Sequence, residues 1–242
     1  MNAKDFCRMP VWYAKLGQYA FPTRFVPVSP EAAELIASGE AKENLKLLPI
    51  AELIDRIDSE LDYIPGNCFA SVDTCSPTDT MRYYTKRGAT YSAKSTFVNL
   101  ASSYKVQLAA SAGEVKNICL RPFRRMSLPR EFRLFLRDGK LVAMSQYHLI
   151  RHFRRLEGVK AQYWEEAKKF VELIAPELPQ EPLVMDIYFT ASGKKLIIDF
   201  NPWGEPTDPL MLMNWDQDWS KEIGIVLMAP PVKMSGDVNV SF

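Results

Sequence analysis

The sequence lacks long apolar runs and has almost no net charge. No hydrophobic run approaches the ~20 residues that cross a bilayer as a helix, and Lys4, Asp5 and Arg8 interrupt the region where a signal peptide would be apolar. Thirty Lys and Arg residues against 29 Asp and Glu residues leave a net charge of +1. No overall field therefore attracts nucleic acid or an anionic membrane, and any polyanion site must be local. We expect an intracellular, cytoplasmic protein without a membrane segment and without a strong nucleic-acid signal.

Cysteine and glycine are also scarce. The four cysteines fall at no spacing typical of a zinc site or a redox motif, and they are Cys7, Cys68, Cys75 and Cys119. We expect reduced, partly buried thiols. The 17 prolines outnumber the 11 glycines, which indicates defined turns rather than flexible linkers. With 47% hydrophobic residues, the 242-residue chain is long enough for one large domain or two small lobes with a real core.

Helix signals dominate the first half of the chain and strand signals the second. Ser29-Pro30 predicts a helix start and Gly39 its end, whereas the aromatic segment 11–28 is expected to be irregular and to pack onto the body. Further helices are expected at 50–61, 76–87, 92–104 and 159–174, and strands at 69–72, 118–123, 131–137 and 140–146. These elements predict an α+β fold with a helix-rich lobe at residues 1–117 and a second lobe at residues 118–242.

The stretch from Leu183 to Asp208 carries the clearest chemical pattern, LVMDIYFTASGKKLIIDFNPWGEPTD. Ser192-Gly193 is typical of a two-residue hairpin turn. Asp186 and Asp199 lie equally far from that turn and therefore face each other, with Cβ atoms roughly 4.5–5.5 Å apart. Asn201 shares their face because it lies two residues beyond Asp199. The other face is apolar and is expected to pair Met185, Ile187 and Phe189 with Phe200, Ile198 and Leu196.

Two carboxylates this close repel each other unless a proton or a cation intervenes. Mg²⁺ takes oxygen ligands, commonly one or two carboxylates together with substrate phosphates, and Asn201 adds a neutral oxygen. The hairpin therefore predicts a Mg²⁺–nucleotide site with Asp186, Asp199 and Asn201 as ligands. Two alternatives remain open: an acidic pair on a solvent-exposed face, or a turn of another length, because a shift by one residue would place the acids on opposite faces.

Asp138-Gly139 predicts another hairpin, between the strands at 131–137 and 140–146. Its register opposes Glu131 to Gln146 and Arg133 to Met144, so that Glu131, Arg133 and Gln146 form one polar face. The apolar face consists of Phe132, Leu134 and Leu136. Arg133 either grips phosphate oxygens in a bidentate manner or forms a surface salt bridge. Arg121, on the preceding strand, is a further candidate for phosphate binding.

A basic cluster follows this hairpin and consists of Arg151, Arg154, Arg155 and Lys160. It either binds phosphate or RNA, or it is a solvated turn. His148 and His152 are interpreted as surface residues rather than catalysts. No residue is therefore assigned a catalytic role.

Several segments resemble the cell division cycle protein 123 family. The most specific are MDIYFTASGKKLIIDFNPWGEPTD at 185–208 and EFRLFLRDGKLVAMSQ at 131–146. PVWYAKLGQYAFPTRFVPV at 10–28 and CFASVDTCSPTDT at 68–80 are similar more loosely. The resemblance covers roughly Val11 to Trp215.

The resemblance implies an ATP-grasp fold, in which ATP lies between two lobes and their antiparallel sheets. It implies Mg²⁺ on Asp186, Asp199 and Asn201, and adenine beside the strand from Ile118 to Arg121, so Cys119, Leu120 and Arg121 become nucleotide-binding candidates together with Arg133 and Gln146. Eukaryotic members of the family are assembly factors for translation initiation factor 2 and bind its gamma subunit.

The chain departs from the family pattern in three places. Ser71 and Thr78 occupy positions where the family has a lysine and a basic residue that would contact phosphates. A lost charged hydrogen bond weakens binding by ~1.5–3 kcal/mol, and Lys86, Arg87 or Lys94 are possible substitutes. Tyr147-His148 replaces the family's basic–acidic pair.

Three functions remain open on this basis. The first is an ATP- and Mg²⁺-binding assembly factor or chaperone. The second is an ATP-grasp ligase or phosphotransferase of prokaryotic or viral origin with an unknown acceptor, and the third is a binding module whose nucleotide site has decayed. The segment 209–215 with Trp219, Met228 and Met234 either forms a partner surface or belongs to the core.

Overall fold

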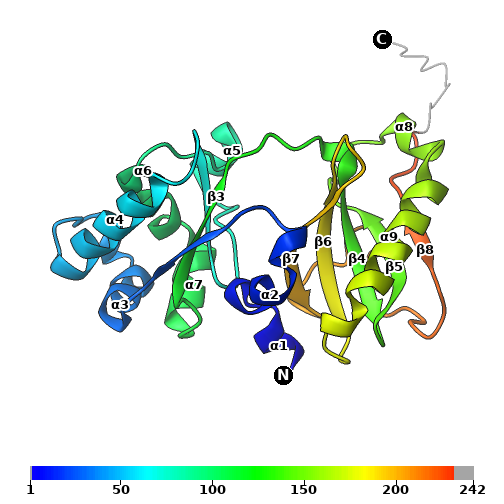
Figure 1. The fold of residues 1–242 in the computed structure, drawn as a ribbon, viewed down its shortest axis with the longest axis horizontal. Coiled ribbons are helices and arrows are strands. Elements are labelled where there is room, and N and C mark those ends of the chain that lie inside the picture. The colour runs from blue at the N-terminus through cyan, green and yellow to red at the C-terminus, as the bar shows by residue number, and fades with distance from the viewer. Residues whose placement is uncertain (1, 232–242) are drawn as a thin grey trace, which may run out of the picture.

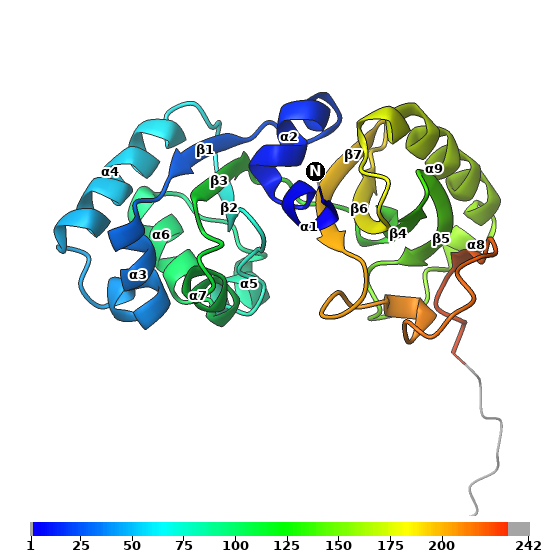
Figure 2. The ribbon, with the colours of Figure 1, turned by 90° about the horizontal axis from the view of Figure 1, so that it is seen from below.

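The computed structural model describes residues 2–231, which form two lobes, each built on its own sheet (Figures 1 and 2). The chain crosses between the lobes twice, once at residues 17–23 and again at residues 123–127. Both lobes combine helices with largely antiparallel strands, so the predicted α+β fold is confirmed. None of the described helices combines the length and the apolar character that a bilayer crossing would need.

The first lobe has a three-stranded antiparallel sheet in the order β1-β3-β2. Its strands are β1 (Arg24–Pro27), β2 (Cys68–Val72) and β3 (Asn117–Pro122), and its helices are α3 (Pro30–Ser38), α4 (Leu48–Leu61), α5 (Met81–Lys86), α6 (Ala93–Ala101) and α7 (Tyr104–Ser111). Buried residues of α3, α4, α6 and α7 share one core cluster with alternate residues of the strands, so these helices cover one face of the sheet. The other face looks toward the second lobe.

The second lobe has a five-stranded sheet in the order β7-β6-β4-β5-β8. The strands are β4 (Glu131–Arg137), β5 (Lys140–Gln146), β6 (Leu183–Phe189), β7 (Lys195–Pro202) and β8 (Gly224–Val226), and the helices are α8 (Arg154–Glu157) and α9 (Lys160–Ile174). Short 3-10 turns occur at Gly17–Tyr19, Glu40–Lys42, Leu128–Arg130, Ala175–Glu177 and Leu210–Leu212. Helix α9 packs on one face of the sheet, with Trp164, Ala167 and Phe170 in the core.

The N-terminal segment differs from its prediction. Residues 11–28 are not irregular: they contain most of α2 (Met9–Leu16), which follows α1 (Ala3–Phe6), and all of β1. Met9, Trp12 and Leu16 recur at helical spacing and are buried. The rings of Phe6 and Trp12 lie 5.1 Å and 5.5 Å from that of Phe200. Helices α1 and α2 therefore pack on the second lobe, although they begin the chain.

Strand β3 also shifts the boundary between the lobes. The sequence assigns residues 118–242 to the second lobe, but β3 pairs with both β1 and β2 and so belongs to the first sheet. The second lobe therefore begins after Pro122.

The helix predictions are largely confirmed, with corrections at helix ends. Helix α3 begins where Ser29 Oγ accepts a hydrogen bond from Ala32 N, and it ends at Gly39, whose φ is +78°. The helix expected at 92–104 is two helices, because Ser103 caps a new one by accepting a hydrogen bond from Val106 N. Helix α5 begins later than expected, at its cap Thr80.

All four thiols are free, and Cys7, Cys68 and Cys119 are buried. Burial raises the pKa of Cys68 to about 11 and that of Cys7 to about 12, so both thiols remain protonated at neutral pH.

Candidate functional site

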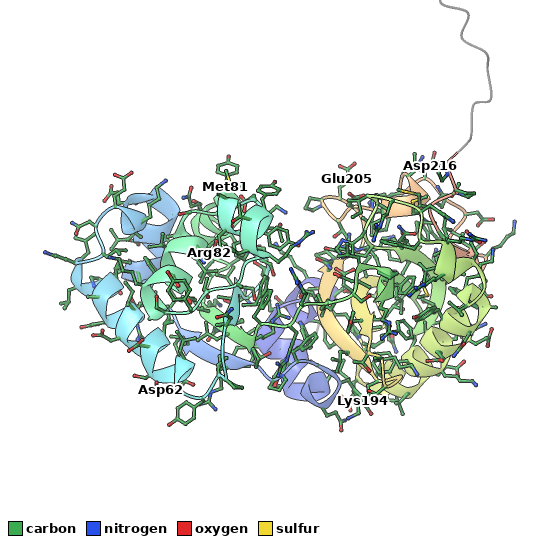
Figure 3. The ribbon with its side chains drawn as sticks, turned by 90° about the horizontal axis from the view of Figure 1, so that it is seen from above. Asp62, Met81, Arg82, Lys194, Glu205 and Asp216 are labelled. Carbon is green, nitrogen blue, oxygen red and sulfur yellow. The ribbon has the colours of Figure 1, made fainter. Side chains whose placement is uncertain are left out.

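A cleft of about 730 Å³ separates the two lobes. Its first wall comes from the loop after β2, from α5 and α7, and from the end of β3, and its second wall from β4, β6 and β7. Residues 123–126 of the linker between the lobes also line the cleft. Figure 3 shows Met81 of the first lobe and Glu205 of the second projecting on the same side of the molecule. The predicted metal ligands Asp186, Asp199 and Asn201 all line this cleft.

The hairpin that carries these residues pairs the two acids as predicted, but its turn is longer and the register near the turn differs. Asp186 does lie opposite Asp199. The turn is longer than the predicted Ser192-Gly193 turn, because Thr190 N donates to Lys194 O at 2.8 Å. A β-bulge between Asp186 and Ile187 then restores the register by adding one residue to β7.

The bulge corrects the predicted apolar face. Ile187 lies opposite Ile197, not Ile198, and Phe189 lies opposite Lys195, not Leu196. Ile197 is fully buried, whereas Ile198 joins Asp199 in lining the cleft.

Asp186 is engaged in a buried bidentate ion pair. Arg133 Nε and Nη2 donate to its two carboxylate oxygens at 2.8 Å each. Arg133 is 7% exposed and Asp186 is 4% exposed. Arg133 therefore does not form the surface salt bridge that the sequence left open as one alternative. Its third group, Nη1, donates to Asp208 O at 2.7 Å. The neighbouring Asp186 carboxylate raises the pKa of Arg133 against the effect of burial. Arg133 therefore neutralises one acid of the pair and fixes its orientation.

Asp199 is the less compensated acid. Its Oδ1 accepts a hydrogen bond from Phe200 N at 2.9 Å. Desolvation, aided by the Asp186 charge, raises the pKa of Asp199 to about 7, although Arg121 acts in the opposite direction. Arg121 itself is buried and donates from Nη1 to Ile198 O at 3.0 Å, which ties β3 of the first lobe to β7 of the second.

The oxygen atoms at this position suit a Mg²⁺ ion that also binds phosphate. Asn201 Nδ2 donates to Asp186 Oδ2 at 3.1 Å, which leaves its carbonyl oxygen without a hydrogen bond to any of residues 2–231. An ionised carboxylate offers about four lone-pair sites, so Asp186 can accept more than its Arg133 bonds. Within the described residues no group of three or more His, Cys, Asp or Glu side chains could hold a metal ion. Two carboxylates and one amide oxygen are donors of the kind that Mg²⁺ takes together with substrate phosphates.

The polar face predicted for β4 and β5 wrongly includes Gln146. A bulge between Phe135 and Leu136 shifts the register, so Gln146 lies opposite Phe132, and Arg133 lies opposite Ser145. Gln146 is buried, but it is not among the residues that line the cleft. Its Nε2 donates to the carbonyl oxygens of His148 and Arg151. The apolar face of Phe132, Leu134 and Leu136 is confirmed.

Of the three candidates on β3, only Arg121 reaches the cleft. Cys119 and Leu120 are fully buried and lie in the cores on the two faces of the sheet. Since β3 is the central strand, its neighbours β1 and β2 flank both residues, and neither presents a free edge to a nucleotide. The cleft meets the chain at Arg121 and the linker that follows.

Lys105 is a cation of the cleft that the sequence did not reveal. Its Nζ donates to Thr78 Oγ1 at 2.9 Å, and its backbone N–H donates to Asp79 Oδ2. Lys105 lies in the first turn of α7, after a break at residues 102–103 that the sequence interpretation did not predict, since it expected one helix over 92–104. Of the suggested substitutes, Arg87 lines the cleft and Lys86 and Lys94 do not. Lys105 of α7 therefore places an ammonium group beside Thr78.

The pair Tyr147-His148 also lies in the cleft. His148 Nε2 lies 2.7 Å from Glu131 Oε2, and its side chain is 16% exposed, so the interpretation as a surface residue is wrong. The Arg133 guanidinium lies 5.4 Å from the centre of the Tyr147 ring. His152 is also largely covered, with Nδ1 2.8 Å from Met228 O. The basic cluster is solvated, with Arg151, Arg154, Arg155 and Lys160 exposed.

The tryptophan-rich tail belongs mainly to the core. Trp219 and Leu212 are buried with Phe135 and Val184, and the rings of Trp203 and Trp215 pack against them. Met213 is exposed, and Met234 lies outside the described residues.

Comparison with known proteins agrees with this architecture. A model of the D123 family matches residues 92–222. The zebrafish (Danio rerio) translation initiation factor eIF2 assembly protein is 33% identical over 101 residues, which are 41% of this chain and 29% of that protein. The Xenopus laevis protein of the same name is 38% identical over 88 residues, 36% of this chain and 26% of that protein. These matches thus span less than a third of either relative.

A solved structure extends the likeness to almost the whole chain. Cdc123 from Schizosaccharomyces pombe superposes with a TM-score of 0.76 over 93% of this chain and 96% of that one, at 18% sequence identity. The two proteins therefore have the same fold. The predicted family resemblance is confirmed, since the family model covers more than half of the residues: the chain belongs to the D123 family.

Proposed function

We propose that the chain binds ATP with Mg²⁺ in the cleft between its lobes and serves as an assembly factor for translation initiation factor 2, through the gamma subunit. The observation that carries the first part is the opposite charge of the two walls. The first wall and the linker contribute Arg87, Lys105, Arg121, Arg124 and Arg125, and the second contributes Glu131, Asp186, Asp199 and Asp208. Arg133 also lines the second wall, but Asp186 pairs with it. A Mg²⁺–triphosphate group carries both signs and matches both walls at once.

The second wall supplies the metal ligands in this proposal. Asp199 and the free carbonyl oxygen of Asn201 would bind Mg²⁺ directly, and Asp186 would share its carboxylate between Mg²⁺ and Arg133. A cation beside Asp199 favours its ionised form and removes the repulsion from Asp186. Without Mg²⁺ the same acids would face the phosphates and repel them, so binding of ATP is expected to require the ion.

The first wall supplies the phosphate contacts. Lys105 is fixed beside Thr78, and its ammonium group has two N–H donors besides the one used there. Arg121 is already bonded to Ile198 O and contributes mainly its charge. The base would lie beside the linker that follows Arg121. A nucleotide held between two antiparallel sheets is the arrangement that the ATP-grasp resemblance implies.

The assembly role rests on family membership. The zebrafish and Xenopus relatives carry the name of eIF2 assembly proteins, and an assembly factor for a translation factor would act in the cytoplasm.

Calorimetric titration with ATP tests the nucleotide site. Parent protein is expected to bind ATP in Mg²⁺ and to lose most of that affinity in EDTA. Lys105→Ala should weaken binding about tenfold or more, because a charged hydrogen bond is worth ~1.5–3 kcal/mol. Lys116→Ala, another exposed lysine of the first lobe, is the matched control and should bind as the parent does. Equal affinity in Mg²⁺ and EDTA would contradict the metal assignment.

A separate measurement tests the assembly role. Size-exclusion chromatography of the chain with purified initiation factor 2 gamma subunit should give a complex, and the alpha subunit of the same factor should give none. Absence of a gamma complex would remove the assembly proposal and leave the ATP proposal standing.

A further inference from the structure

The segment from Met81 to Lys94 concentrates positive charge on a protein that is nearly neutral overall. It holds four cations and no acidic residue, whereas the whole chain has a net charge of +1. The cations are Arg82, Lys86, Arg87 and Lys94. Lys86, Arg87 and Lys94 are exposed, and none of the four forms an ion pair within residues 2–231. This is the kind of local field that a near-neutral protein needs in order to bind a polyanion.

Two tyrosines of this segment are exposed, and one of them lies beside a cation. Tyr84 and Tyr91 are 70% and 74% exposed. The Arg82 guanidinium lies 5.8 Å from the centre of the Tyr91 ring, and the Tyr83 ring lies 6.5 Å from that of Tyr84. Tyr84 lies two residues from both Arg82 and Lys86 in α5 and so on another side of the helix. We call Arg82, Lys86, Tyr91 and Lys94 the α5 patch. Figure 3 labels Met81 and Arg82 at this part of the first lobe.

The backbone beneath the α5 patch is firmly held. Thr80 caps α5 through Tyr83 N, and its hydroxyl donates to Asn99 Oδ1 at 2.8 Å in the buried core. Arg82 Nη1 donates to Ala89 O at 2.9 Å and so closes the loop after the helix. Gly88 has a φ of +79°, and a Cβ there would lie 2.8 Å from the Phe69 ring. The Tyr91 ring and the patch cations therefore stand on a preorganised support, which lowers the entropic cost of binding.

We infer that the α5 patch binds single-stranded nucleic acid. Exposed aromatic rings stack on unpaired bases and neighbouring cations contact the phosphates, which is the usual combination for single strands. A protein partner would need a desolvated core poor in charge, yet Met81 is the one exposed apolar side chain of the segment that is not a tyrosine. Tyr83 and Arg87 line the cleft, so a bound strand would run toward its mouth. This inference does not depend on ATP binding.

Fluorescence anisotropy with a labelled oligouridylate of about 12 nucleotides tests the inference, since single-strand sites span about 4–16 nucleotides. The parent is expected to bind, and binding should weaken with salt with a slope of about −2 for three phosphate contacts. Tyr91→Ala should weaken binding about tenfold, whereas Tyr84→Ala, outside the patch, should not. Lys86→Ala/Lys94→Ala should weaken binding and flatten the salt slope. A parallel titration with an oligodeoxyuridylate of the same length distinguishes RNA binding from DNA binding.

Matched controls lie elsewhere on the first lobe. Tyr63 is 69% exposed and also lies beside an arginine, Arg24, so Tyr63→Ala tests for a general effect of losing a tyrosine. Lys42→Ala/Lys46→Ala removes the same charge at two other exposed lysines. Neither control should alter binding. Equal losses in patch and control variants would overturn the inference, as would equal binding of a duplex. Displacement of the RNA by poly-L-glutamate at equal charge would instead indicate an acidic protein partner and would also overturn it.

Discussion

Asp199→Asn is expected to lose Mg²⁺-dependent ATP binding and, near neutral pH, to be more stable than the parent. The substitution removes a charged ligand, so the affinity for ATP in Mg²⁺ should fall by about a hundredfold, given ~1.5–3 kcal/mol for one charged interaction. Calorimetric titration measures this loss, and Asp199→Ala should behave alike.

The stability gain follows from the pKa of the same carboxyl group. In the folded chain it is about 7, whereas its ordinary value is 3.8. Between about pH 4 and pH 7 the folded state therefore holds a proton that the unfolded state has released, and stability falls as the pH rises through this window. The neutral amide of Asp199→Asn escapes this loss. Its free energy of unfolding near pH 8 should exceed that of the parent by about 2–4 kcal/mol, with little difference near pH 4.

Urea denaturation at both pH values provides the readout, without nucleotide or Mg²⁺. Asp216→Asn changes an exposed aspartate of the same lobe (Figure 3) and should alter neither stability nor binding. Retained Mg²⁺-dependent affinity in Asp199→Asn would refute the ligand assignment, and a pH-independent stability difference would refute the titration argument.

Arg133→Met is expected to destabilise the second lobe severely. The substitution leaves the Asp186 carboxylate buried without its bidentate partner, and it also removes the donor to Asp208 O. Breaking a buried ion pair by removal of one partner costs about 3–5 kcal/mol. The free energy of unfolding in urea at neutral pH should fall by this amount.

Two further variants separate burial from charge. Lys168→Met removes an ion pair to Glu222 whose acidic partner is half exposed, and it should leave the free energy of unfolding nearly unchanged, because solvent screens such a pair. The double variant Arg133→Met/Asp186→Leu should recover much of the loss, because a buried pair replaced by apolar residues of similar size is often nearly neutral. A loss below about 1 kcal/mol in Arg133→Met would show that the pair is hydrated.

The two hairpins show how far strand register can be predicted from this sequence. Counting from the Ser192-Gly193 turn paired Asp186 with Asp199 correctly, because the longer turn and the bulge in β7 offset each other. The same counting failed for Gln146, because the bulge in β5 has no such compensation. A bulge depends on how a strand packs in the complete sheet, so the local alternation of polar and apolar side chains does not predict it.

Contacts between distant segments account for the other differences. The alternation of β3 indicates a buried strand, but only the sheet shows that both its edges are occupied, which excludes Cys119 and Leu120 from the cleft. Lys105 reaches Thr78 because Asp79 holds the start of α7, an interaction across 26 residues. Periodicity and caps, in contrast, are local properties, and they predicted α3, α4 and α9 nearly to their ends.

The double crossing of the chain between the lobes limits how the cleft can change its width. The connections at residues 17–23 and 123–127 lie apart in space (Figure 1), and each has a fixed contour length. Side chains also join the lobes: Arg121 of β3 donates to Ile198 O of β7, and Arg8 and Met9, beside helices that pack on the second lobe, bond to Asp73 after β2. A change in the width of the cleft would therefore have to break these contacts as well as bend both connections.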